Sequence, residues 1–287
     1  DIAQLCDQVA GLPLGIELAA SWVEHFTVAE IGHSLMEIVV EPEQADGYVS
    51  RHQTLDTLFE YSWRLLSSAQ QQILAHLSAF RGGFDRTAAG AITGSTLSDL
   101  SSLLAHSLIQ RVSAGRYDLH PLVQEFAARK LASAAIPTLF HAHAAYYLNL
   151  LVTTELTNRA ALRIDFNNLR SAWQQAIVAM DSQLMARSAE AFGEFIARFG
   201  LMRDGNQLFA AAAAQFATLP PAQELVAQLL DQQALFLRCL DGLRAVKPLQ
   251  QRVLRLTQNQ KLQTRAHFDL ANHYAEKYAR HLSDLNV

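Results

Sequence analysis

Residues 108–121 read LIQRVSAGRYDLHP, and this stretch decides the fold. Before and after it, apolar residues recur at the spacing of one helical face. Inside it the period falls to two, and two short alternating runs flank a Ser-Ala-Gly turn, as in a β-hairpin. His120-Pro121 then begins another helix, because proline is well tolerated in the first turn of a helix.

Helical patterns precede and follow the hairpin. An apolar stripe runs from Leu55 to Leu66, and Ser67 or Ser68 can cap a second helix that reaches Phe80. Short helices are expected over 85–92 and 97–107. Three helices, a hairpin and a closing helix are the pattern of a winged-helix domain, which we place at residues 51–135.

No strand pattern follows residue 136. Helices are expected at roughly 138–155, 161–180, 183–200, 204–218, 221–240, 244–258 and 260–283. Helix pairs recur at intervals of about 40 residues, which favours the stacked helical hairpins of a TPR-like solenoid over residues 136–287.

The first 50 residues predict a short helical segment of their own. Two helices are interrupted by Gly-Leu-Pro-Leu at 11–14, where Pro13 can occupy the first turn of the second helix. The polar stretch 41–51 is interpreted as a linker. The predicted fold class is therefore mainly α: a short helical segment over 1–50, a winged-helix domain with a small β-hairpin, and an α-solenoid.

Composition limits the function classes. Hydrophobic residues make up 50% of the chain and charged residues 17%, which excludes a disordered protein. The net charge of -4 suits a nucleic-acid surface poorly, and no apolar run approaches the roughly 20 residues of a membrane span. Two cysteines far apart in sequence indicate a reducing cytoplasm. The chain begins with Asp1 and not Met, and we interpret it as a fragment without a signal peptide.

Four segments in consistent order carry a resemblance to a known family. They are 6–20 (CDQVAGLPLGIELAA), 55–66 followed by AFRGGF at 79–84, 117–123 (YDLHPLV) and 166–173 (FNNLRSAW). The chain resembles the STAND class of signal-transduction ATPases with an NB-ARC-type core, in particular bacterial regulators with TPR-like repeats. It is similar to their C-terminal portion, which lacks the P-loop core. The first segment looks like the GLPL motif, and the third occupies the place of the MHD motif.

The resemblance implies roles for two residues. The GLPL proline of such proteins packs beside the base and ribose of ADP, which falls on Pro13. The MHD histidine reaches the β-phosphate, which falls on His120. Both would be ADP contacts only in the intact protein. The motif here reads Leu-His-Pro in place of Met-His-Asp, so the role of the acidic third residue does not carry over. Purely structural roles remain open too, with Pro13 as a helix-start proline and His120 as a helix-entry residue.

The chain contains no phosphate-binding loop. None of its lysines follows a glycine-rich loop, and no apolar strand ends in paired acids. Phosphoryl transfer needs the phosphate cradle, the lysine and the Mg²⁺ ligands together. We therefore expect no enzyme activity, no catalytic residue and no cofactor in the fragment. The resemblance implies that the intact protein is an ATPase that uses ADP or ATP with Mg²⁺.

DNA binding by this fragment is not expected. Residues 51–135 carry eight Lys and Arg against six Asp and Glu, and the expected recognition helix at 97–107 has neither Lys nor Arg. Base readout in a major groove needs such donors. A DNA-binding winged-helix transcriptional regulator with a helical scaffold is kept as the alternative function.

The leading hypothesis is a regulatory and sensor fragment of a STAND nucleotide switch in transcription or signalling. The winged helix would act as an intramolecular nucleotide lock against an upstream ATPase domain of the same chain. The helical repeats would bind an inducer ligand or a partner protein, since stacked hairpins create a concave surface. We expect a cytoplasmic protein without membrane contact.

Other conspicuous residues favour structural roles. His141 and His143 are two apart and point to different faces of a helix, so no metal site is expected there. Asp269 and Glu276 suggest a solvated helix face. Four phenylalanines suggest core between repeats: Phe192, Phe195, Phe199 and Phe209.

Overall fold

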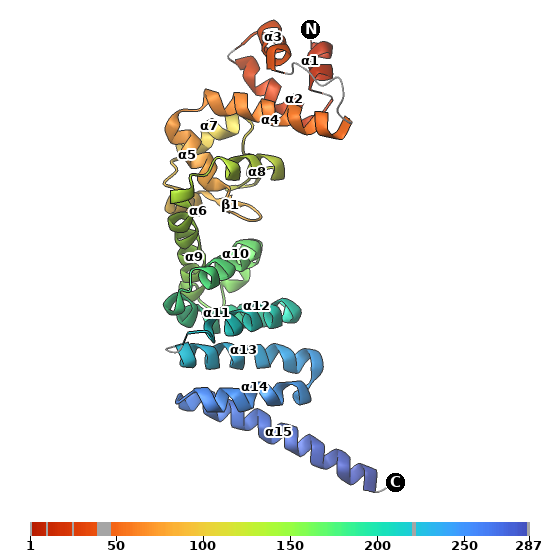
Figure 1. Cartoon of the computed structure of the whole chain (residues 1–287), viewed down its shortest axis with the longest axis vertical. Helices are drawn as coiled ribbons and strands as arrows, with labels where there is room; N and C mark the ends of the chain where they lie inside the picture. The colour runs from red at the N-terminus through yellow and green to blue at the C-terminus, as the bar shows by residue number, and fades with distance from the viewer. Residues whose placement is uncertain (1, 10, 25, 39–46, 220–221, 286–287) are drawn as a thin grey trace. The chain divides into compact units, whose positions relative to one another are not determined.

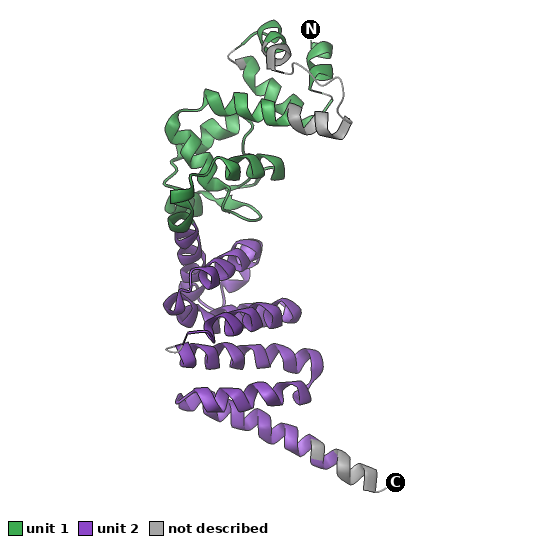
Figure 2. Ribbon diagram, in the orientation of Figure 1, with its two compact units in different colours: residues 1–139 green, residues 140–287 purple. Residues whose placement is uncertain are grey.

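The computed structural model describes residues 2–9, 11–24, 26–38, 47–219 and 222–285 (Figure 1). These residues are mostly helical and include one three-stranded antiparallel sheet. The predicted mainly α fold class is confirmed. The chain divides into two compact units, Asp1–Leu139 and Phe140–Val287 (Figure 2).

Unit 1 begins with four helices and one short 3-10 helix. These are α1 (Ile2–Gln8), α2 (Pro13–Ser21), η1 (Trp22–Glu24), α3 (Val28–Ile38) and α4 (Gly47–Leu65). Gly11, with a φ of +64°, allows the sharp turn between α1 and α2. The buried indole N–H of Trp22 donates to Ser62 Oγ at 3.1 Å and so ties the end of α2 to α4.

The predicted linker over 41–51 is wrong in its last part. Residues 47–51 belong to α4, and residues 41–46 lie outside the described residues. No proline follows Pro42 in this stretch, so helical hydrogen bonding can extend back from the apolar stripe that begins near Leu55.

The second half of unit 1 alternates helices with short strands. Its elements are α5 (Ser68–Leu77), β1 (Phe84–Asp85), α6 (Arg86–Thr93), α7 (Leu97–Ala105), β2 (Gln110–Ser113), β3 (Arg116–Asp118) and α8 (Pro121–Arg129). Ser67 caps α5 in a capping box with Gln70. The strand order β1-β3-β2 places Phe84 opposite Tyr117. This order of elements agrees with the predicted winged helix, and the hairpin lies where it was expected.

Unit 2 is a stack of helices in which most helices pack against their neighbours in sequence (Figure 2). After α9 (Ile136–Thr153), which begins at the end of unit 1, come the 3-10 helix η3 (Arg159–Asp165), α10 (Phe166–Val178), α11 (Ser182–Arg198), α12 (Met202–Phe216), α13 (Gln223–Asp241), α14 (Leu243–Leu256) and α15 (Gln260–Leu285). All seven helices expected after residue 136 are confirmed. Helix α13 also contacts α11 and α15, although one helix separates it from each of them in sequence.

The repeat pattern of unit 2 has a clear packing basis. Helices α11, α13 and α15 begin at residues 182, 223 and 260, which agrees with the expected interval of about 40. Trp173, Phe192, Phe209 and Phe236 form a continuous buried aromatic row, with successive ring centroids 4.8 to 6.2 Å apart. The predicted core role of Phe192, Phe195 and Phe209 is confirmed, whereas Phe199 is only half-buried.

The predicted division into residues 1–50, 51–135 and 136–287 stays a prediction. Its first border lies inside α4, and its second lies between the 3-10 helix η2 (Ser133–Ala135) and α9. In the part of the chain that the structure describes, no helix combines the length and apolar character needed to cross a bilayer.

Candidate functional site

Pro13 begins helix α2 at the surface of unit 1. It occupies the first turn of α2, where its missing N–H leaves no hydrogen bond unmade. The first turn of α2 packs closely against its neighbours at Gly15. A Cβ at this position would lie 3.1 Å from Val9 and 3.3 Å from Leu58. Pro13 itself is exposed, and the side chains of Leu14 and Glu17 line the adjacent pocket.

His120 connects strand β3 to helix α8. Its Nδ1 accepts the backbone N–H of Leu122 at 3.2 Å and so caps α8. A ring nitrogen that accepts a hydrogen bond carries no proton, so the neutral imidazole holds its proton on Nε2. His120 is half-buried, and its side chain lines the same pocket as Leu14 and Glu17.

One pocket of about 110 Å³ thus joins the two sequence motifs. Its walls come from α2, the end of α7, the start of β2 and the start of α8: Leu14, Glu17, Leu104, Ser107, Leu108, Ile109, Gln110 and His120. The structure therefore brings His120 next to the helix that Pro13 begins, although Pro13 is not a lining residue. The lining includes no Lys or Arg among the described residues, and Glu17 contributes an acidic group.

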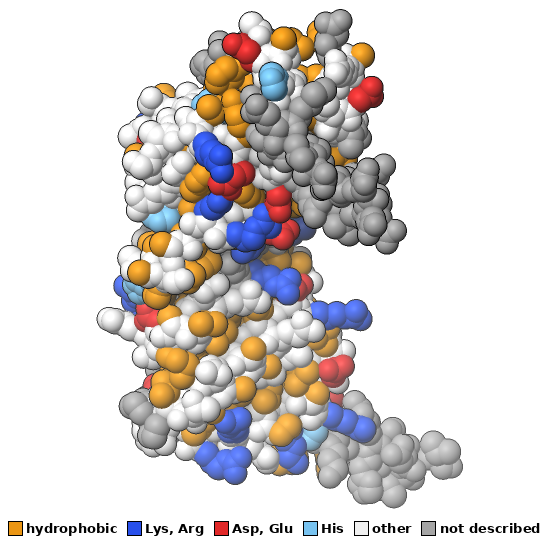
Figure 3. All heavy atoms as spheres, turned by 45° about the horizontal axis from the view of Figure 1, so that its top comes forward, with side chains coloured by type: hydrophobic (Ala, Val, Ile, Leu, Met, Phe, Trp, Pro, Cys, Tyr) orange, Lys and Arg blue, Asp and Glu red, His pale blue; other side chains and the backbone are white. Residues whose placement is uncertain are grey.

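Three basic residues of the predicted winged helix lie close to acids: Arg64, Arg129 and Lys130. Arg129 lies 2.5 Å from Asp56, and Lys130 lies 2.5 Å from Glu60. Figure 3 likewise shows blue and red side chains next to each other on the face that it draws. Helix α7 presents Asp99, which caps the helix through Thr96. These pairs compensate part of the positive charge that the region could offer to a DNA phosphate backbone.

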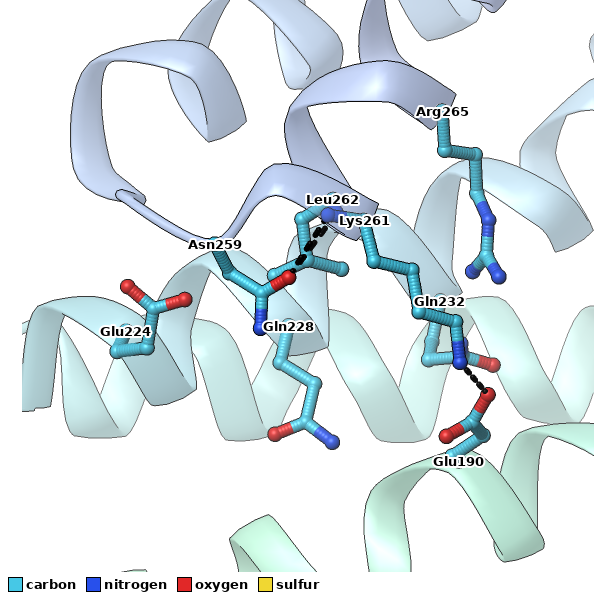
Figure 4. Close-up of a pocket in the computed structure, with 8 residues that line it drawn as sticks. All are labelled: Glu190, Glu224, Gln228, Gln232, Asn259, Lys261, Leu262 and Arg265. Carbon is cyan, nitrogen blue, oxygen red and sulfur yellow. Dashed lines mark hydrogen bonds and ion pairs between the residues drawn. The ribbon is translucent and has the colours of Figure 1, made fainter.

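A second pocket lies in unit 2 between α11, α13 and α15 (Figure 4). The sequence predicts a ligand or partner on the repeats but does not identify the residues that bind it. The sequence does show Glu224, Gln228 and Gln232 at one-turn spacing, which is the pattern that could have pointed to this pocket.

The two histidines of α9 occupy different environments, as expected. His143 is fully buried, with its Nε2 3.4 Å from Asn168 Oδ1, whereas His141 is exposed and lies 3.8 Å from Asp181. Among the described residues, no three His, Cys, Asp or Glu side chains lie close enough to hold a metal ion.

Asp269 does not lie on a solvated face, which corrects the prediction made for it. Only 2% of Asp269 is exposed, and it accepts hydrogen bonds from Arg238 at 3.0 Å and Gln250 at 2.9 Å. The packing of α13 and α14 against α15 supplies both donors, and sequence spacing along α15 alone does not reveal them. Glu276 is exposed, as predicted.

The chain is similar to curated proteins of mycobacteria. It is 29% identical over 192 residues to the "Putative HTH-type transcriptional regulator Rv0890c" of Mycobacterium tuberculosis strain H37Rv and to the corresponding protein of Mycobacterium bovis. Each match covers 60% of this chain and 22% of the relative. An uncharacterized protein of Mycobacterium tuberculosis is 34% identical over 92 residues, which are 32% of this chain and 23% of that protein. The chain spans about a fifth of the length of these relatives. No family model matches it.

Among solved structures, the chain is similar to a STAND protein with a tetratricopeptide repeat sensor from Pyrococcus horikoshii. The two are 13% identical, and the match covers 91% of this chain and 47% of that one with a TM-score of 0.34. A TM-score of this size shows neither a common family nor a common fold.

Proposed function

We propose that this chain is the regulatory part of a nucleotide-switched STAND-type protein that controls transcription or signalling. The observation that carries the proposal is the pocket beside His120. Two segments more than 100 residues apart, the GLPL-like helix α2 and the histidine of the MHD-like motif, line this one pocket. The names of the mycobacterial regulators support a role in transcriptional regulation.

The chemistry of His120 suits a contact with phosphate. Its Nδ1 is engaged by Leu122, so the Nε2–H group is the donor that remains for a phosphate oxygen. Capping α8 also fixes the direction of the ring, because the hydrogen bond holds the imidazole against the helix start. A small change at the nucleotide could in this way act on the orientation of α8.

The pocket does not suffice to hold a diphosphate alone. Glu17 repels phosphate, and no cation lies among the described lining residues to offset it. ADP, when bound, supplies the phosphate charge to which His120 donates. The cradle and the Mg²⁺ ligands for it would come from an ATPase core that precedes this segment. The chain itself is therefore proposed to be non-catalytic, and to act in the cytoplasm.

The nucleotide lock is tested by the rate of ADP release. The experiment uses the protein extended upstream by its ATPase core, loaded with a fluorescent ADP analogue and chased with unlabelled ADP. His120→Ala should release the analogue at least about tenfold faster, which is the cost of one lost hydrogen bond to a charged group. The exposed His141→Ala on α9 is the matched control and should release it at the wild-type rate. Equal release by wild type and His120→Ala would show that the lock role is wrong.

The alternative is direct DNA binding by the predicted winged helix, which the names of the mycobacterial regulators also support. A gel-shift titration with duplex DNA at low salt separates the two functions. We expect no shift from this chain, because the basic residues of α8 are paired with acids of α4. A salt-sensitive shift would favour the alternative.

A further inference from the structure

The pocket of unit 2 is lined mainly by polar residues. It has a volume of about 160 Å³ and is lined by Glu190 of α11, by Glu224, Gln228 and Gln232 of α13, and by Asn259, Lys261, Leu262 and Arg265 at the start of α15. Glu224, Gln228 and Gln232 follow one another at four-residue spacing on one face of α13 (Figure 4). At a rise of 1.5 Å per residue, this row is about 12 Å long.

Gln232 is the residue that most strongly indicates a ligand-binding site in this pocket. Only 4% of the residue is exposed, yet its side-chain amide has no hydrogen-bond partner among the described residues. Gly193 of α11 makes the room for it, because a Cβ at that position would lie 2.1 Å from Gln232 Oε1. The amide atoms face the pocket and remain accessible from it, so the amide is available to a ligand.

An ion pair with Asp231 holds the side chain of Arg265 in place. Its Nη1 lies 2.5 Å from Oδ2 of Asp231, a fully buried carboxylate, while the Arg265 side chain remains 30% exposed at the pocket wall. An arginine has five N–H donors in a rigid fork, so one bond to Asp231 leaves others available. The ion pair therefore orients a cation at the pocket. Burial of Asp231 raises the pKa of its carboxyl.

Two cations and the carboxylate of Glu190 lie at one end of the row, and the carboxylate of Glu224 lies at the other. Figure 4 shows the side-chain ends of Lys261, Arg265 and Gln232 at one end of the pocket and Glu224 at the other. Lys261 also pairs with Glu190 at 2.7 Å, but both side chains are more than half exposed, so this pair is weak and exchangeable.

Between the ends, the pocket offers one acceptor and one donor. Gln228 donates to the carbonyl of Ala186 and keeps its Oε1 as an acceptor. Asn259 accepts the N–H of Lys261 through its Oδ1 and keeps its Nδ2 as a donor. An acceptor and a donor side by side match the N–H and C=O groups of a peptide backbone.

From these features we propose that this pocket binds a short extended peptide with free termini. This inference rests on the sensor function proposed above. The carboxylate of the peptide would lie at Arg265 and Gln232, and its amino terminus would face Glu224. A row of 12 Å fits about four residues at the 3.3 Å rise of an extended chain. Leu262 is the single apolar side chain among the described lining residues, so recognition is of the termini and backbone more than of side chains.

Calorimetric titration of the full chain with tetra-alanine tests the ligand. Free tetra-alanine should bind saturably. The C-terminally amidated peptide should bind at least about tenfold more weakly, and the N-acetylated peptide several-fold more weakly, because each loses a charge-assisted contact. Acetate should show no saturable binding. Equal binding of the free and amidated peptides, binding of acetate alone as tightly as the peptide, or no binding of the free peptide would each overturn the proposal.

Two variants test the residues. Gln232→Leu keeps the volume of the side chain and removes the unpartnered amide, so it should keep or raise the melting temperature while weakening the peptide about tenfold. Lys261→Met should weaken it by a smaller factor. The exposed Arg244→Met on α14 is the charge control and should bind as wild type. Wild-type affinity in Gln232→Leu would contradict the assignment of the carboxylate end.

The two proposals can fail separately. ADP release from His120→Ala involves unit 1 alone, whereas the peptide titration involves residues of unit 2 alone. Loss of the peptide result with an intact ADP result would remove only the ligand assignment. The reverse outcome would remove the nucleotide lock and leave the peptide pocket standing.

Discussion

Arg265 and Asp231 form an ion pair between α15 and α13, with 2.5 Å between Nη1 and Oδ2. Asp231 is fully buried, and burial raises the pKa of its carboxyl. The positive charge of Arg265 opposes this rise, and the neighbouring carboxylate of Asp269 adds to it. The folded protein therefore binds the Asp231 proton more tightly than the unfolded chain does.

The first prediction concerns the pH dependence of stability. In the wild type, the free energy of unfolding should fall as pH rises from the ordinary carboxyl range through the raised pKa of Asp231, because the folded state must then carry a buried charge. Asp231→Asn removes the titrating group and should flatten this part of the curve. Urea unfolding at a series of pH values measures it. The exposed Asp241→Asn on the same helix should keep the wild-type slope, and an unchanged slope in Asp231→Asn would contradict the prediction.

The second prediction concerns the close approach of α12 to its neighbours. A Cβ on Gly205 would lie 2.8 Å from Ile196 Cγ2 and 2.9 Å from the ring of Phe236, and both neighbours are fully buried. We expect Gly205→Ala to lower the free energy of unfolding by about 1–3 kcal/mol through overpacking. Gly32→Ala in α3 is the control, since its nearest contact would be an ordinary 3.6 Å. Thermal unfolding followed by circular dichroism compares them, and equal melting temperatures would refute the clash.

The third prediction concerns a strained residue at the pocket beside His120. Ser107 has a φ of +54° where α7 ends, a conformation that costs a residue with a side chain about 1 kcal/mol. Ser107→Gly should therefore stabilise the protein by up to about 1 kcal/mol. Ser101→Gly, inside α7, should instead destabilise it by roughly half a kcal/mol. Chemical denaturation of both variants measures the difference. If Ser107→Gly does not stabilise the protein, Ser107 carries no strain.

Sequence periodicity predicted the helices of unit 2 well, because each carries a long apolar stripe that packs on the next. Strand β1 was missed, since two residues, Phe84 and Asp85, show no alternation. The start of α4 was also missed, because its first residues lack an apolar stripe.

Burial of polar residues was the part that the sequence could not supply. Three polar residues that sequence alone would place on a solvated face are buried by the stacking of α13, α14 and α15: Asp231, Asp269 and Gln250. The two residues of the nucleotide hypothesis were identified by resemblance to motifs. Their roles stay a prediction, although α2 and His120 do meet at one pocket.

The last prediction separates the stability of the helical array from its proposed ligand. Gly193 lies inside α11, where alanine is favoured over glycine by about 1 kcal/mol. A Cβ there would collide with Gln232 Oε1 at 2.1 Å, but this oxygen ends a flexible side chain that can turn away. Gly193→Ala should therefore keep or raise the melting temperature while displacing the Gln232 amide, and should weaken free tetra-alanine about as much as Gln232→Leu does. The double variant should bind no more weakly than either single variant, because both remove the same contact. Additive losses would show that Gly193 acts on the peptide by a route other than Gln232.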